Sequence, residues 1–155
     1  MSNPVTFKKE NSNDEPYNNF VYKVDIDNVT IGGFTDVSGL SVRSDVLEYR
    51  EGGSHDVTHV FQNDLSYTNA ILQRGMTKHD DFIKWIRNAV SANREAARYD
   101  IMITMMDRQE NSTWGWKLIN AYPVRWDGPS MMAGGDGFAM ETLEVTYEEL
   151  DFIKH

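Results

Sequence analysis

The sequence predicts a mainly β fold of the α+β type, an antiparallel β-sandwich or barrel with one flanking α-helix. Most segments between turn residues alternate apolar and polar side chains, which is the period of a half-buried strand. Only one segment repeats its apolar residues with helical spacing. A chain of 155 residues has the usual length of one domain and can bury a hydrophobic core of its own.

The N-terminal segment, residues 1–17, is rich in Asn, Ser, Asp, Glu and Pro and has too little apolar surface to offset the entropy of ordering. We therefore expect a flexible arm over 1–17 and a single β domain over 18–155. The arm lacks an apolar core of signal-peptide length, and no later run approaches the length of a membrane span. We expect the chain to be made and folded in the cytoplasm.

The first strand is expected at Phe20–Asp27, where every second side chain is apolar. A tight connection at Asp27 and Asn28 returns the chain through Val29–Ile31, which predicts a hairpin. The remaining strands are expected at Ser38–Arg50, Thr68–Arg74, Arg98–Asp107, Trp114–Trp126 and Phe138–Leu150. Several of them exceed the usual five or six residues.

Two of the long strands change phase in the middle. In Ser38–Arg50, the apolar residues are even-numbered up to Val46 and odd-numbered from Leu47. In Phe138–Leu150, the apolar residues are even-numbered at first and odd-numbered after a change near Glu141 and Thr142. Such a change is produced by a β-bulge, or by a strand that passes from one sheet to another. Each of these strands would then contribute to two surfaces.

The single helix is expected near Asp80–Asn93, as a lid over one end of the sheet. Thr77 with Asp80 three residues later resembles a capping box. One face would carry the apolar residues Phe82, Trp85, Ile86, Ala89 and Val90, and the opposite face Lys84, Arg87, Asn88 and Ser91. Trp85 is therefore a candidate core residue.

The segment Trp114–Pro129 has six large apolar residues at even positions, which predicts a strand with one buried face. These residues are Trp114, Trp116, Leu118, Tyr122, Val124 and Trp126, with Asn120 as the one polar break. We expect Trp116 and Trp126 to be core anchors. Pro123 donates no ladder hydrogen bond and should lie at a bulge or at an exposed edge.

Composition limits the possible partners. Fifteen basic against 24 acidic residues give a net charge of −9 at pH 7. This charge disfavours anionic membranes and nucleic-acid phosphates, so we expect no membrane partner, no specific nucleic-acid binding and, instead, a basic partner surface. Cysteine is absent, so the chain has no disulfide, thiol nucleophile or thiolate metal site.

The sequence contains no convincing catalytic, cofactor or metal site. His55 and His59 have the i, i+4 spacing of metal ligands on a helix, but they follow Gly52 and Gly53 and no helical pattern surrounds them. The last strand carries a series of carboxylates that in an acidic protein are more often an exposed face than an acid/base pair: Glu141, Glu144, Glu148, Glu149 and Asp151. We expect no catalysis and no cofactor. Two other interpretations stay open, an enzyme that uses this acidic strand and a small barrel that holds an apolar ligand among its eight Met and many aromatic residues.

Several motifs, in this order, give the chain a family resemblance. They are GGFTDVSGL from Gly32, EYREGG from Glu48, LQRG from Leu72, FIKWI in the helix, WGWKLINAYPVRWDGP from Trp114 and ETLEVTYEEL from Glu141. From about Phe20 to its C-terminus, the chain resembles the inner tube proteins of contractile phage tails and related extracellular injection systems. NAYPVRWDGP and EYREGG are the most specific of these motifs.

The resemblance implies a structural subunit that forms homo-hexameric rings, with strands from each subunit in one continuous barrel around a lumen. The rings would stack into a tube inside a sheath, joined to baseplate or spike proteins and filled with cargo. Assembly would occur in the bacterial cytoplasm, and the particle could later be extracellular. A near alternative is a baseplate paralogue that initiates the tube.

The resemblance also assigns candidate site residues. The lumen side would carry Ser41, Arg43, Asp45, Thr142, Glu144 and Thr146. The loop Gly52–Asp64 would make the contact between rings, with Gly52, Gly53, His55, Asp56 and His59 as its candidate residues.

Overall fold

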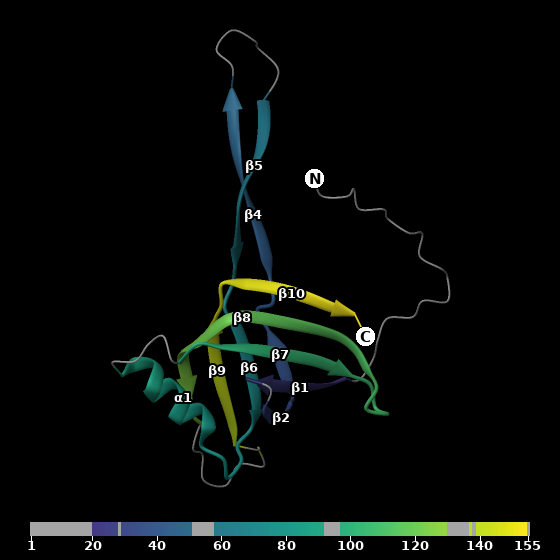
Figure 1. Ribbon diagram of the computed structural model, residues 1–155, viewed down its shortest axis with the longest axis vertical. Helices are drawn as coiled ribbons and strands as arrows, with labels where there is room; N and C mark the ends of the chain where they lie inside the picture. Colours follow the sequence, from purple (N-terminus) through teal and green to yellow (C-terminus); the bar gives the residue numbers. More distant parts are fainter. Residues whose placement is uncertain are drawn as a thin grey trace.

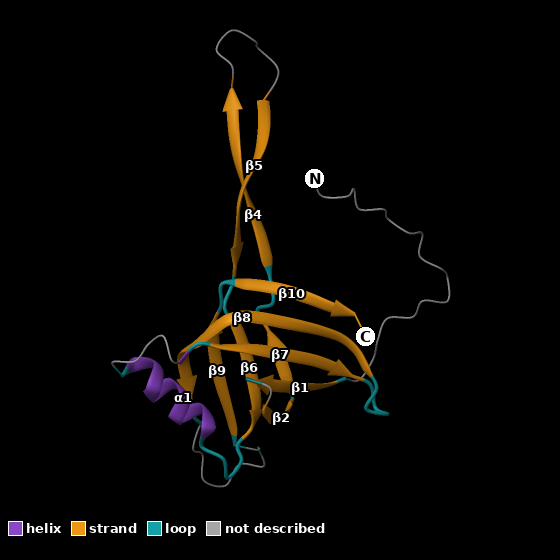
Figure 2. Cartoon of the chain, viewed as in Figure 1, coloured by secondary structure: helices purple, strands orange, loops and turns teal. Residues whose placement is uncertain are grey.

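The computed structural model describes residues 20–27, 29–50, 58–91, 97–129, 137 and 139–154, so the predicted N-terminal arm lies outside the described residues. The strands are β1 (Val21–Ile26), β2 (Val29–Phe34), β3 (Asp36–Ser38), β4 (Val42–Arg50), β5 (Thr58–Tyr67), β6 (Ala70–Gly75), β7 (Tyr99–Met106), β8 (Ser112–Asp127), β9 (Met140–Thr146) and β10 (Glu149–Lys154). The helix described in these ranges is α1 (Asp81–Val90). The arrangement is mainly β with a flanking helix, as predicted (Figures 1 and 2).

The strands of the body form an antiparallel sheet that closes on itself. The order of neighbouring strands is β2-β1-β7-β8-β9-β6-β3, and β10 pairs with β8. β3 continues β2 after Thr35, whose backbone N–H donates to the carbonyl of Gln73 on β6 at 3.0 Å. Because the two ends of the strand order are nearly one strand, the sheet wraps around the core as a flattened barrel, as predicted.

The core fills the space inside this barrel and extends beneath α1. Its most deeply buried members have no exposed surface: Val24, Ala70, Leu72, Ile101, Ile103, Leu118, Ala121, Leu143 and Val145. Trp85 is buried, as predicted, and its indole N–H donates to the carbonyl of Ala97 at 2.7 Å. Trp116 and Trp126 pack against the core but are only partly buried.

The prediction that β8 has one continuous buried face is wrong. In the first half of β8 the even positions face the core, with Leu118 buried and Trp116 partly buried, whereas further on the buried residues are Ala121 and Pro123, and Val124 is exposed. Asn120 causes the first change, because its backbone is in the left-handed region with φ 56°. The second change is a bulge between Pro123 and Arg125, where Pro123 was predicted to lie. β8 is therefore the strand that serves two surfaces: its first half pairs with β7 and β10, its second half with β9.

The phase change predicted near Glu141 is not a bulge. β9 alternates regularly from Met140 to Thr146 and keeps its register with β6. Glu141 belongs to the buried set with Leu143 and Val145, so its charge, and not a change of face, interrupts the apolar pattern. The strand expected over 138–150 also ends at Thr146, and the chain turns before β10.

The predicted strand Ser38–Arg50 is two strands. The strand is broken at Gly39, whose φ is 78°. Only glycine fits here, because a Cβ at this position would lie 2.1 Å from the carbonyl oxygen of Asn69. Beyond this break, β4 and β5 leave the body as a two-stranded ribbon, here called the projecting hairpin (Figure 1). Its register shifts between Ser44 and Val46, which confirms a bulge next to the predicted phase change.

Two further boundaries differ from the prediction. The C-terminal part of the expected loop 52–64 is strand, because residues 58–64 belong to β5. The helix begins at Asp81, and its N-cap, Asp80, makes no side-chain capping bond. The Asp80 carboxylate pairs with Lys84 at 2.7 Å, while the Thr77 hydroxyl accepts from the backbone N–H of His79 at 3.3 Å.

Candidate functional site

The outer side of the sheet portion formed by β3, β6, β9 and the second half of β8 is a polar surface, here called the polar face. The strand register places Thr142 between Gln73 and Asp127, and Glu144 between Ile71 and Arg125. Opposed residues on neighbouring antiparallel strands point to the same side. The polar face comprises Asp36, Ser38, Ile71, Gln73, Arg125, Asp127, Thr142, Glu144 and Thr146.

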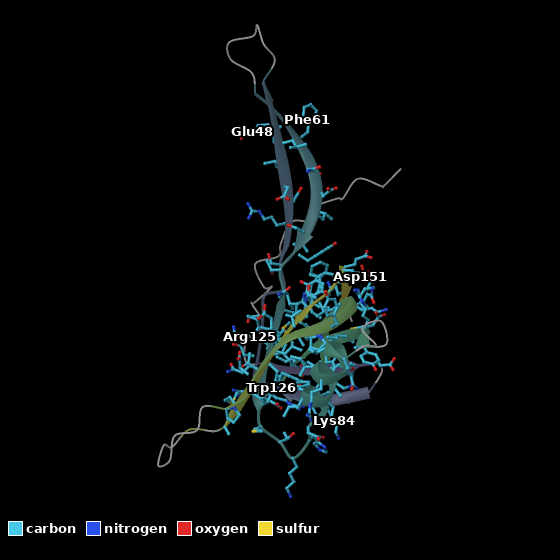
Figure 3. All side chains as sticks on the ribbon, turned by 90° about the vertical axis from the view of Figure 1, so that its left-hand side faces the viewer. Glu48, Phe61, Lys84, Arg125, Trp126 and Asp151 are labelled. Carbon is cyan, nitrogen blue, oxygen red and sulfur yellow. The ribbon has the colours of Figure 1, made fainter. Side chains whose placement is uncertain are left out.

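The polar face is held in place by its own hydrogen bonds and charges. The Asn69 amide donates to the Glu144 carboxylate at 2.8 Å, and Arg125 pairs with Asp127 at 2.9 Å (Arg125 is labelled in Figure 3). Asp36 has no ion pair among the described residues. The face is therefore hydrated and slightly acidic, without a concentrated binding pocket.

The structure brings together only half of the residues predicted for the lumen. Thr142, Glu144 and Thr146 share the polar face. Ser41 lies in the connection between β3 and β4, and Arg43 and Asp45 lie on the projecting hairpin. Arg43 and Asp45 have side chains that are 80% and 57% exposed and pair weakly at 3.9 Å.

Arg43 and Asp45 alternate along β4 with apolar residues, but these apolar residues are not covered in the subunit. Val42 and Val46, on the opposite face of β4, are themselves 42% and 59% exposed. Both faces of the projecting hairpin are thus uncovered in the isolated chain.

The projecting hairpin carries the largest group of exposed apolar side chains on the described surface. They are Val42, Val46, Leu47, Val60, Phe61 and Leu65. A two-stranded ribbon without a covering layer is marginally stable in water, and a contiguous exposed apolar surface marks an interaction site. These two properties are the ones expected of a docking element.

The residues predicted to make contacts between rings fall mostly outside the described part of the chain. Gly52, Gly53, His55 and Asp56 lie there. The backbone of His59 is part of β5 and is opposite Tyr49 of β4. In the sequence this segment connects β4 to β5, which is consistent with a contact role. The contacts of the individual residues remain predictions.

Four strand edges in the body have free backbone groups among the described pairings. β2 pairs only with β1, β3 pairs only with β6, β10 pairs only with β8, and the second half of β8 pairs only with β9. Unpaired edges are templates for strands of other chains. The four-strand portion that carries the polar face thus ends in two free edges, one at β3 and one at β8.

A buried charged cluster lies on the inner side of this portion, and sequence reasoning missed it. Arg74 Nε donates to Glu141 Oε1 at 2.6 Å, and both side chains are 3% exposed. The Trp126 indole N–H donates to the other carboxylate oxygen at 3.0 Å, and the guanidinium lies 4.0 Å from the centroid of Phe82 (Trp126 is labelled in Figure 3). The cluster joins β6, β8, β9 and α1. Its sequence signal is that Glu141 has the same parity as the buried Leu143 and Val145.

A second charged group fixes the left-handed residue of β8. The Asp100 carboxylate accepts from the backbone N–H of Asn120 at 3.1 Å and pairs with Lys117 at 2.9 Å. Both contacts hold the pKa of Asp100 below its usual range, and the hydrogen bond from Asn120 has the larger effect. Burial raises the pKa of Tyr147 in the core.

The described residues show no arrangement suited to metal chemistry. No group of three or more His, Asp or Glu side chains in these ranges could hold a metal ion. Within the same ranges, no helix has the length and apolar character needed to cross a bilayer. The surfaces that remain as candidate functional features are the polar face, the free edges and the projecting hairpin.

Comparisons with known proteins agree with a role in assembly. No curated protein shows significant sequence similarity to the chain. In fold, the chain is similar to a chain of the sheath–tube complex of an extracellular contractile injection system, PVC, in its extended state, with TM-score 0.80, 22% identity, and 92% and 95% of the two chains covered. It is similar to a chain of the anti-feeding prophage tube-terminating cap, with TM-score 0.79, 21% identity, and 95% and 97% covered.

A more distant similarity is to Hcp1 from Flavobacterium johnsoniae, with TM-score 0.52, 14% identity, and 87% and 96% of the two chains covered. The family model of the T4-like virus tail tube protein gp19 matches residues 18–151, which is most of the chain. The chain belongs to this tail tube protein family, as its motifs had indicated.

Proposed function

We propose that the chain forms rings of six copies, and that these rings stack into the inner tube of a contractile particle without any catalytic role. Membership of the tail tube family supports a structural tube subunit. The observation that carries the ring is the four-strand portion with its two free edges, at β3 and at β8. A further similarity, to a chain of the six-fold symmetrised anti-feeding prophage baseplate, supports the number of copies.

The two free edges differ, so they favour a head-to-tail contact. The β8 edge of one copy would pair with the β3 edge of the next, and the repeated rotation would close into a ring. Closure pairs the backbone groups that an isolated subunit leaves free, and it turns the four-strand portions into one continuous barrel.

In such a barrel, the polar face would line the lumen. The opposite side of the same strands is filled by the core, so the hydrated side with Thr142, Glu144 and Thr146 is the one available to a channel. A hydrated wall without a concentrated pocket suits cargo that must slide. Arg43 and Asp45 would lie where the projecting hairpin enters the neighbouring ring.

The remaining partners follow from the particle. The similar PVC chain belongs to a sheath–tube complex, and we propose a surrounding sheath for this chain also. Baseplate or spike proteins would close one end of the tube, and the assembled particle could act outside the cell. Assembly itself would take place in the bacterial cytoplasm.

A baseplate tube paralogue is the second candidate. The anti-feeding prophage baseplate chain has 21% identity and a TM-score of 0.70, over 99% and 98% of the two chains. A ligand-binding barrel is disfavoured because the interior is occupied by fully buried side chains such as Leu72, Ile103 and Leu143.

Electron microscopy of the purified chain, together with sedimentation at moderate salt, tests the proposal. A main tube subunit should give stacked rings whose length grows with concentration, whereas a baseplate paralogue should stop at single rings or short stacks. A chain that stays monomeric at high concentration would contradict both. Salt matters, because a charge of −9 on each copy must be screened in a ring.

A further inference from the structure

The projecting hairpin is joined to the body by two short connections. In the body, β3 pairs with β6, and in the hairpin β4 pairs with β5. Between these two ladders, the chain passes through residues 39–41 on one side and 68–69 on the other, which belong to no strand. These two segments are here called the hairpin root. A few residues at the ends of strands are the usual site of a hinge, so the hairpin root decides in which direction the hairpin leaves the body.

The two connections of the hairpin root are bonded to each other. The backbone N–H of Thr68 donates to the carbonyl of Ser41 at 3.3 Å, and the hydroxyl of Thr68 donates to the carbonyl of Gly39 at 2.6 Å. All three residues belong to the hairpin root. These bonds therefore keep the two connections side by side, but they do not fix the hairpin against the body.

The backbone turns over within the hairpin root. Tyr67 and Asn69 are two residues apart and would point to the same side of a regular strand. Instead, the ring of Tyr67 packs against the buried Tyr147, with 5.7 Å between the ring centroids, whereas Asn69 is bonded to the polar face. The hairpin therefore does not take its direction from β6 through a regular strand.

Side chains attach the hairpin root to the body on both sides. On the core side, the contact between Tyr67 and Tyr147 is between two tilted rings and has little directional preference. On the polar face, the amide of Asn69 donates to the carboxylate of Glu144 at 2.8 Å. A hydrogen bond to a charged acceptor is directional and about twice as strong as one between neutral groups. Glu144 itself is held in the regular ladder of β9, opposite Ile71 of β6, so it is a rigid anchor.

The length of the hairpin amplifies any movement of its root. β4 has nine residues, which span about 30 Å at the usual rise of a strand. A change of about 10° at the hairpin root would therefore displace the far end by about 5 Å, which is the distance between neighbouring strands in a sheet. Figure 3 shows how far Glu48 of the hairpin lies from the body.

We propose that Glu144 is a positioning residue, which fixes the direction of the projecting hairpin through the amide of Asn69. Glu144 then has a second role besides its place on the wall of the proposed lumen. Its importance for the tube rests on the proposed function, whereas the positioning is a property of the single chain. A change of the wall at Glu144 should therefore disturb the hairpin, while a change at Thr142, on the same strand and face, should not.

The distance between two spin labels tests the positioning in the dissociated subunit. The native chain has no cysteine, so labels can be attached at Glu48→Cys on the hairpin and Asn88→Cys on α1, both exposed positions. Pulsed dipolar spectroscopy should give one narrow distance distribution. Glu144→Ala and Asn69→Ala, which remove the same bond from its two ends, should each raise the population of other distances about tenfold. Thr142→Ala is the matched control and should keep the narrow distribution.

A conservative variant separates the hydrogen bond from the charge. Glu144→Gln removes the negative charge but keeps an oxygen that can accept from Asn69, so it should retain the narrow distribution. A broad distribution in Glu144→Gln would show that the charge, and not this bond, determines the direction. An unchanged distribution in both alanine variants, or one in the native chain as broad as theirs, would overturn the inference.

Electron microscopy extends the test to the assembled particle. If the native chain forms tubes, Glu144→Ala should form fewer and shorter tubes than Thr142→Ala. Equal tubes from these two variants would refute a role of the positioning in assembly. If the native chain forms no tubes, the proposed function fails while the spin-label result is unaffected, so the two failures are distinguishable.

Discussion

Removal of the cation from the buried Arg74–Glu141 pair is expected to destabilise the subunit strongly. Arg74→Met leaves the Glu141 carboxylate, 3% exposed, without its counter-ion. The substitution also removes the hydrogen bond from Arg74 Nη1 to the carbonyl of Ile31 at 3.1 Å and the guanidinium contact with Phe82 at 4.0 Å. Loss of one partner of a buried pair typically costs about 3–5 kcal/mol, which is much of the stability of an ordinary domain.

The double variant Arg74→Met/Glu141→Leu shows how much of this cost comes from the unpaired carboxylate. With both charges gone, no uncompensated carboxylate remains, and the main defect is the Trp126 indole N–H, which loses its acceptor. An unsatisfied buried donor costs about 1–3 kcal/mol, so the double variant should be more stable than Arg74→Met alone. The two substitutions should therefore be strongly non-additive.

The assay is urea unfolding of dissociated subunits, followed by tryptophan fluorescence at two protein concentrations to exclude association. Lys84→Met is the matched control, since it breaks an exposed pair with Asp80 and should change the unfolding midpoint little. A cost below about 1 kcal/mol for Arg74→Met, the value of a surface pair, would refute the reasoning. Simple additivity in the double variant would refute it as well.

Four other predictions follow from the same structure. Trp126→Ala should cost about 3 kcal/mol in urea unfolding, the lower end for a core tryptophan because the ring is only partly buried; native-like stability would show that the ring does not anchor the core. Asn120→Ala should cost about 1–2 kcal/mol because of its φ of 56°, whereas Asn120→Gly should be tolerated; equal loss in both would place the effect in the side chain. Asp100 has a pKa below its usual range in the folded state, so its contribution to the free energy of unfolding is present above the pKa of the unfolded state and is lost as the pH falls through the pKa of the folded state. Asp100→Asn should therefore flatten the decline of the melting temperature below about pH 4. An unchanged decline at acid pH would contradict this. Arg43→Glu should leave the melting temperature of the subunit unchanged, because the side chain is 80% exposed, and a clear drop would show that it contributes to the fold.

Alternation of apolar and polar residues located most strands, and helical apolar spacing located the helix. The apolar spacing of Phe82 and Trp85 was sufficient to identify the buried side of α1, because a regular helix maps sequence spacing directly onto direction. Val90, which continues the same spacing, is the last helical residue and is 77% exposed. The motifs then identified the family, which the sequence periods alone could not do.

The errors arise where a single residue changes the geometry or where partners are distant. Asn120 appears in the sequence as a polar break, but its left-handed backbone reverses the buried side of β8. Glu141 appears as an exposed carboxylate because its counter-ion, Arg74, lies 67 residues away in the sequence. The segment 58–64 was assigned to a loop because the bulge of the projecting hairpin disrupts its alternation. Of these three features, only the burial of Glu141 has a local signal, the position it shares with Leu143 and Val145 in the alternation of β9.

The position of β8 has a consequence for how the subunit opens. Its first half is hydrogen-bonded on both sides, to β7 and to β10, and its second half continues into the pairing with β9. Neither side of the barrel can separate from the rest without breaking hydrogen bonds to this one strand. Partial unfolding of low free energy is therefore expected only where β8 stays folded. Amide protons in the middle of β8 should exchange with solvent at the rate of global unfolding, while those of the projecting hairpin should exchange far sooner. Such a subunit keeps a rigid body while its hairpin remains free to find a neighbour. Assembly would then be detected when the amide protons of the projecting hairpin become as protected from exchange as those of β8.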